Sequence, residues 1–94
     1  MHTMVVRMSM DPARAEEAAR HLREDVVGWA RQLPGFVNGQ WLRSPEGSEG
    51  MGVVAFASGD AAASAARGPR SYPRDASRAW NVESVTVYEQ LTSA

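Results

Sequence analysis

The chain contains no cysteine, no lysine and no long apolar run. Without cysteine it has no disulfide bond, thiol nucleophile, iron–sulfur ligand or cysteine zinc site. The 10 basic residues are all arginine and are balanced by 11 acidic residues, so no basic excess favours binding to nucleic acid. No apolar stretch approaches the ~20 residues of a membrane span, and the start of the chain lacks a signal-peptide pattern. We therefore expect a soluble, cytoplasmic protein that binds neither nucleic acid nor membranes.

Histidine is also scarce, because only His2 and His21 are present. The chain has no His-Glu-x-x-His spacing, no glycine-rich phosphate loop, no Ser-His-Asp arrangement and no paired-carboxylate signature. The residues that usually hold a metal, haem or flavin are therefore missing. We predict a protein with no metal site and no cofactor.

The first third of the chain predicts a strand followed by a helix. Residues 2–10 alternate between a mainly apolar face and a second face, which is the period of a strand. Asp11 and Pro12 are typical of a helix start, and apolar residues then recur at helical spacing from Ala15 to Leu33. Pro34-Gly35 is predicted to end this helix and to reverse the chain.

The rest of the chain adds two strands, a second helix and a final strand. We expect strands at residues 36–44, 51–57 and 82–91, a turn at 45–50, a helix from Asp60 capped by Ser58, and one or two helical turns within 73–80. Gly68-Pro69 is predicted to break the second helix. The element order predicts a single α+β domain over residues 1–94, with the ferredoxin-like βαββαβ pattern and a four-stranded antiparallel sheet.

Two helices cover only one face of a four-stranded sheet, yet both faces of several strands carry apolar residues. The examples are Val5, Trp41, Val54, Phe56 and Val82. The second face then needs another cover, and a second copy of the chain is the simplest one because two-fold homodimers are the commonest oligomers. We expect a homodimer.

Four segments in a fixed order carry a family resemblance. They are Pro34-Gly35-Phe36, Arg43-Ser44-x-x-Gly47, Ser58-Gly59-Asp60-Ala61 and the closing segment from Val82 to Glu89. In their order and spacing the chain resembles the dimeric α+β barrel superfamily, and within it the small proteins grouped with the antibiotic biosynthesis monooxygenases. The resemblance implies a homodimer whose two sheets form a barrel, and a ligand cavity in each subunit between sheet and helices.

The superfamily includes cofactor-free oxygenases of aromatic polyketides, haem-degrading enzymes, isomerases and proteins without known activity. The Asn, Trp and Tyr of the polyketide oxygenases fall near Gly52, Phe56 and Ala62 here, and a His that often precedes the Arg-Ser pair is Leu42. Residues 58–81 contain no His, whereas the haem-degrading members use one in or near the second helix. The resemblance therefore implies a fold, and the reaction has to be argued from the site.

The aromatic residues supply the candidate binding site. Trp80 and Tyr72 flank an arginine-rich segment beside Asn81, and Trp41 lies in the second strand. Large aromatic rings with a polar edge suit a cavity that holds a planar ligand. We predict Trp80, Tyr72, Asn81 and Trp41 as ligand-binding residues, with Arg70 or Arg74 available for an anionic group.

The catalytic candidates are Tyr72, as a hydrogen-bond donor, and His21. His21 lies one helical turn from both Glu17 and Asp25, a spacing that suits either an oriented general base or a solvated helix flank. The leading hypothesis is a cofactor-independent monooxygenase or related enzyme acting on a small apolar or aromatic molecule. The alternatives are a non-catalytic small-ligand-binding or accessory protein, and a proton-transfer isomerase or cyclase.

Overall fold

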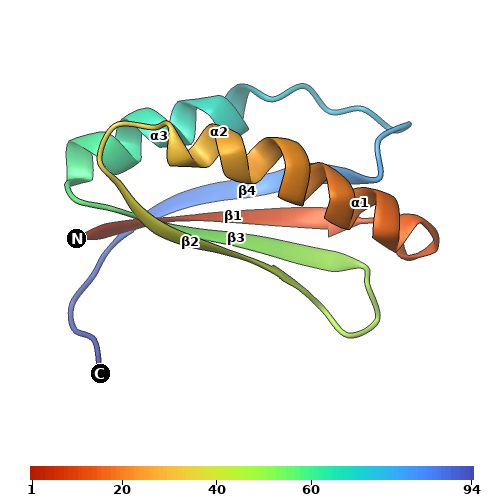
Figure 1. The fold of residues 1–94 in the computed structure, drawn as a ribbon, viewed down its shortest axis with the longest axis horizontal. Coiled ribbons are helices and arrows are strands. Elements are labelled where there is room, and N and C mark those ends of the chain that lie inside the picture. Colours follow the sequence, from red (N-terminus) through yellow and green to blue (C-terminus); the bar gives the residue numbers. More distant parts are fainter.

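Two helical segments lie on one face of a four-stranded antiparallel sheet (Figure 1). The computed structural model describes residues 1–94. The elements in chain order are β1 (His2–Met10), η1 (Pro12–Arg14), α1 (Ala15–His21), η2 (Leu22–Val26), α2 (Val27–Arg31), β2 (Phe36–Arg43), β3 (Glu49–Phe56), α3 (Gly59–Ser71) and β4 (Trp80–Glu89). The strand order β2-β3-β1-β4 confirms the predicted ferredoxin-like topology.

The first helical segment follows the predicted start and reversal but is not one regular helix. The Asp11 carboxylate accepts a hydrogen bond from the N–H of Ala13, and Pro12 opens a short 3₁₀ turn. After α1 the chain widens into the π-helical turn η2, in which the N–H of Val27 donates to the carbonyl of Leu22. A π turn accommodates one extra residue, and such turns are frequent at functional sites.

The second helix differs from the prediction at its end. Ser58 caps it as expected, with its hydroxyl accepting from the N–H of Ala61. The predicted break at Gly68-Pro69 is wrong, because α3 continues through Pro69 to Ser71. The proline lies in the last turn, where its missing N–H removes only one of the final helical hydrogen bonds.

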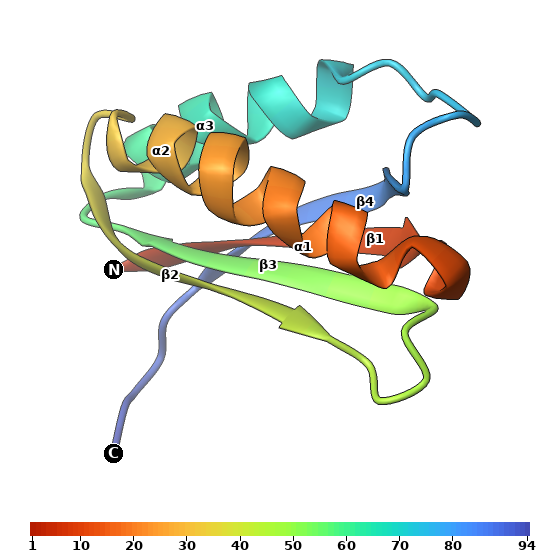
Figure 2. The same cartoon turned by 45° about the vertical axis from the view of Figure 1, so that its right-hand side comes forward.

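The helical turns predicted within residues 73–80 are also wrong. This segment is an irregular loop, seen at the upper right of Figure 2, and β4 begins earlier than expected, at Trp80. Its backbone groups find side-chain partners instead of helical ones. The Asn81 carboxamide accepts from the N–H of Asp75 and donates to the carbonyl of the same residue.

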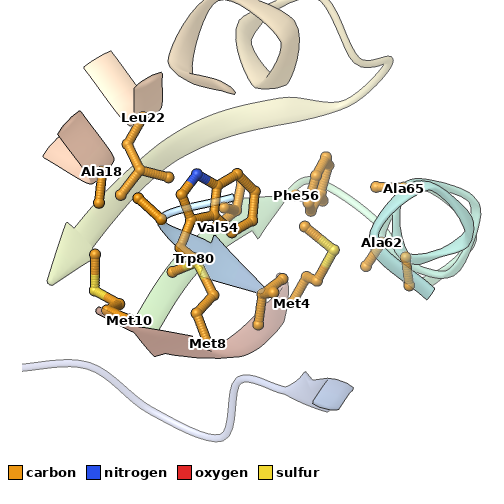
Figure 3. Close-up of a cluster of buried hydrophobic side chains, with 13 residues drawn as sticks. Met4, Met8, Met10, Ala18, Leu22, Val54, Phe56, Ala62, Ala65 and Trp80 are labelled. Carbon is orange, nitrogen blue, oxygen red and sulfur yellow. The ribbon is translucent and has the colours of Figure 1, made fainter. Parts of the chain in front are cut away.

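The core lies between the sheet and the helices. It contains the β1 methionines, with Leu22 from the first helical segment, Phe56 from β3 and three alanines of α3. Figure 3 shows Ala18 and Leu22 at one end of this cluster and the α3 alanines at the other, with Trp80 between them. Small side chains on α3 let that helix approach the sheet closely.

The opposite face of the sheet has no helix over it (Figure 1). Of the residues expected to show two-sided apolar strands, Trp41, Val54, Phe56 and Val82 all belong to the helix-facing side, and only Val5 lies on the open face. The strand register places four further apolar residues on the same face, namely Val53, Met51, Leu42 and Tyr88. None of the helices is long and apolar enough to span a membrane.

Candidate ligand-binding site

A cavity of about 290 Å³ opens between the sheet and the two helical segments. All four strands and both helical segments contribute to its wall, and most of the lining is apolar. The lining residues are Met4, Val6, Met8, His21, Leu22, Asp25, Val26, Trp29, Trp41, Gly52, Val54, Gly68, Pro69, Tyr72, Trp80 and Val82. Three of the four residues predicted to bind a ligand, Trp80, Tyr72 and Trp41, lie in this lining.

Aromatic rings form two walls of the cavity. The Trp80 indole is 5% exposed and stacks on the Tyr72 ring, with ring centroids 5.7 Å apart and an interplanar angle of 26°. On the sheet, the Trp41 ring lies over Gly52, where a Cβ would come within 3.2 Å of the Trp41 Nε1. The glycine therefore gives the indole room to lie against the strand, and Trp41 lines the cavity from the sheet.

Trp29 forms part of the rim. It belongs to the apolar residues that recur at helical spacing between Ala15 and Leu33, yet it is 40% exposed. Its ring packs against Gly68 of α3, where an added Cβ would lie 2.9 Å from the Trp29 Cζ2. Gly68 thus serves as a contact surface for Trp29 rather than as a helix break, and sequence spacing alone does not reveal this contact.

His21 is the polar side chain that reaches both the rim and the aromatic wall. Its Nδ1 accepts a hydrogen bond of 2.9 Å from the Nε1–H of Trp80, and the two ring centroids are 5.4 Å apart. Its Nε2 lies 3.5 Å from Asp25 Oδ2. The other carboxylate of the predicted stripe, that of Glu17, pairs with Arg14 instead.

Asn81 does not line the cavity. Its carboxamide is engaged by the loop, since Oδ1 accepts from the N–H of Asp75 and from Arg78, while Nδ2 donates to the Asp75 carbonyl. The two arginines considered for an anionic group are also elsewhere. Arg70 donates to the Val85 carbonyl, and Arg74 pairs with Glu83.

Arg78 is the structural residue that sequence reasoning missed. Its guanidinium carbon lies 4.3 Å from the centroid of the Tyr72 ring and 5.3 Å from that of Trp80. The same group donates to the carbonyl oxygens of Trp80 and Pro73, each at 2.9 Å. Arg78 therefore holds the loop against the aromatic wall. Nothing in the sequence distinguishes it from the neighbouring arginines.

The chain matches no protein-family model, and no curated protein matches its sequence. Solved structures are similar over the whole chain, each at 17% identity. The haem-degrader MhuD of Mycobacterium tuberculosis, with two haems bound in its active site, has a TM-score of 0.75 and coverage of 100% of this chain and 99% of that one. HapK of Hahella chejuensis has a TM-score of 0.72, with 100% and 96% covered.

A third similar structure is the monooxygenase ActVA-Orf6 of Streptomyces coelicolor in complex with nanaomycin D, with a TM-score of 0.64 and 99% and 89% of the two chains covered. Together these similarities confirm the predicted βαββαβ fold of the chain.

The residues of this cavity do not fit haem. His21 is the one histidine in the lining, and a metal-bound imidazole normally donates its second N–H to an acceptor. If Nε2 bound iron, Nδ1 would carry the proton and would meet the indole N–H of Trp80, donor against donor. No group of three or more His, Cys, Asp or Glu residues is placed to hold a metal ion.

Proposed function

We propose that this protein binds a planar, largely apolar aromatic molecule in the cavity and acts on it as a cofactor-independent monooxygenase or related enzyme. The observation that carries the proposal is one largely apolar cavity with the rings of Trp80, Tyr72 and Trp41 in its lining. Small-molecule sites are typically concave and apolar, with a few polar groups that fix orientation. The proposal also accords with the monooxygenase of similar fold that was solved with a small-molecule ligand.

A cofactor-independent oxygenation requires a substrate that supplies its own electrons. An anthrone is such a substrate, because its methylene group is oxidised to a carbonyl while one oxygen atom of O₂ enters the product and the other leaves as water. The protein then contributes binding, orientation and exclusion of water. An apolar cavity provides these contributions.

We further propose that the active form is a homodimer formed through the open face of the sheet. Val5 and Val53 are paired directly across β1 and β3 on that face, and Leu42 and Tyr88 leave 48% and 51% of their surfaces exposed there. Apolar side chains left exposed on the open face of a sheet favour association with a second copy. The cavity lies on the other side, so each subunit keeps its own site.

The main alternative is a small-ligand-binding protein without catalytic activity. One observation favours it. The lining is mostly apolar, and His21, Asp25 and Tyr72 are its polar side chains, so few groups are available for catalysis. A proton-transfer isomerase is less well supported. A neutral His21 has its only unprotonated nitrogen, Nδ1, occupied by the Trp80 N–H, so no free basic nitrogen faces a substrate.

Oxygen uptake and thermal shift separate these functions. The purified protein is incubated with anthrone and with hydroxylated naphthalenes, and O₂ consumption is compared with autoxidation in buffer. An oxygenase consumes O₂ faster than buffer and loses this activity in Trp80→Ala, whereas a binder shows a raised Tm without added O₂ consumption. If no planar compound raises the Tm and none increases O₂ consumption, both the oxygenase and the ligand-binding protein are refuted.

A further inference from the structure

We infer that His21, fixed by Trp80 in the tautomer that carries its proton on Nε2, donates a hydrogen bond to a carbonyl oxygen on the edge of the bound ligand. The inference rests on the proposed binding of a planar molecule and narrows its chemistry. The ligand is then an aromatic molecule with an apolar body and a neutral carbonyl at the rim. Trp80 acts as a positioning residue, and His21 as the group that contacts the ligand.

The tautomer follows from the hydrogen bond between the two rings. Indole has only a donor, so the 2.9 Å contact from Trp80 Nε1 requires a lone pair on His21 Nδ1. In a neutral imidazole the proton is then on Nε2. Trp80 is 5% exposed and its ring is stacked on Tyr72, which leaves the indole little freedom to turn away.

The Nε2–H of His21 is available to a ligand. Nε2 makes no hydrogen bond within the chain, and Asp25 Oδ2, at 3.5 Å, is too far away for a good one. The Asp25 side chain is 72% exposed and keeps its contact with water, so a ligand oxygen can take its place beside Nε2. Both residues line the cavity, and the apolar surface of Met4, Met8 and Val54 lines the same space.

The charge of Asp25 favours a neutral carbonyl oxygen over an anionic phenolate oxygen as the acceptor at His21. A phenolate oxygen placed at His21 Nε2 would lie beside the Asp25 carboxylate and would be repelled by it. A neutral carbonyl oxygen avoids this cost. The local backbone supports a functional position, because the π turn η2 begins directly after His21 and contains Asp25.

The tautomer is tested on the free protein by long-range ¹H–¹⁵N NMR of the histidine rings at about pH 8, where imidazole is mostly neutral. We expect His21 to show a single population protonated on Nε2, and Trp80→Phe, which replaces the indole by a smaller aromatic ring without an N–H, to give a mixture of tautomers. A wild-type His21 protonated on Nδ1, or an unchanged spectrum in Trp80→Phe, would overturn the positioning role.

Ligand contact is tested with fluorenone and fluorene, planar molecules that differ by one carbonyl oxygen. The ratio of their Kd values is measured for the wild type, for His21→Phe and for the control Glu16→Gln, an exposed change in α1 that lies away from the cavity and from the surface around His21. We expect the preference for fluorenone to fall about 2- to 10-fold in His21→Phe and to persist in the control.

The experiment distinguishes failure of the carbonyl contact from failure of planar-ligand binding. If fluorene and fluorenone bind but the ratio is the same in His21→Phe, the carbonyl contact is wrong while binding of planar molecules stands. If neither compound binds the wild type, the ligand contact is wrong and the proposed function loses its support as well. A preference for 2-naphthol at alkaline pH over fluorenone would replace the neutral carbonyl with an anionic oxygen.

Discussion

The indole N–H of Trp80 donates to Nδ1 of His21 and so joins β4 to the end of α1 across 59 positions of sequence. The bond connects the buried wall of the cavity with its polar rim. Because one donor and one acceptor are matched, it orients both rings at once. The stacking of Tyr72 on the other side of Trp80 completes a continuous aromatic wall.

Arg78 is expected to stabilise the loop that backs this wall. Arg78→Ala removes hydrogen bonds to the carbonyls of Trp80 and Pro73 and to Asn81, and should lower the free energy of unfolding by about 2 kcal/mol. Urea denaturation measures the change. Arg74→Ala, which removes one exposed ion pair in the same loop, should have a much smaller effect. Equal losses in the two variants would show that Arg78 has no special structural role.

The homodimer is tested by placing a charge on the open face of the sheet. Val53→Glu introduces a carboxylate beside Val5 and should raise the dimer Kd at least about 100-fold, because burying an unpaired charge is costly. Sedimentation velocity at micromolar concentration reports the change. Ser64→Glu adds the same charge on an exposed position of α3 and should leave a dimer intact. A wild-type monomer would contradict the proposal directly.

Acid stability should depend on Glu83. The Ser9 hydroxyl and the Arg74 guanidinium hydrogen-bond to this carboxylate and hold its pKa below the ordinary value of 4.5. A lowered pKa contributes stability that is present above 4.5 and is lost as the pH falls through the folded value. The Tm of Glu83→Gln should therefore fall less than that of the wild type when the pH drops below 4.5. Parallel curves for the two proteins would exclude this contribution.

Much of the fold could be predicted because local signals and the global pattern agree. Strand β1 occupies the predicted residues 2–10, and Asp11 and Ser58 cap as expected. The prediction failed where tertiary contacts outweigh local preference. Gly68-Pro69 reads as a helix break, but the glycine surface receives the ring of Trp29 and the helix continues.

Part of the candidate site could also be predicted from the sequence. Large aromatic rings with a polar edge near the end of the chain predicted cavity residues at Trp80 and Tyr72, and both line the cavity. The hydrogen bond between Trp80 and His21 joins residues 59 positions apart, and no local spacing rule predicts such a contact. Asn81 and Arg78 differ from neighbouring polar residues only in which backbone groups of the loop they meet.

NMR with fluorene tests whether the cavity between sheet and helices binds a planar apolar molecule. We predict intermolecular NOEs from fluorene to the side chains of Met4 and Val54 and to the Trp80 ring, which line the cavity together. Val82→Phe, which enlarges a lining residue, should abolish them, whereas Ser64→Phe, which adds the same ring at an exposed position of α3 outside the lining, should preserve them. Binding without NOEs to these residues, or unchanged NOEs in Val82→Phe, would contradict the account.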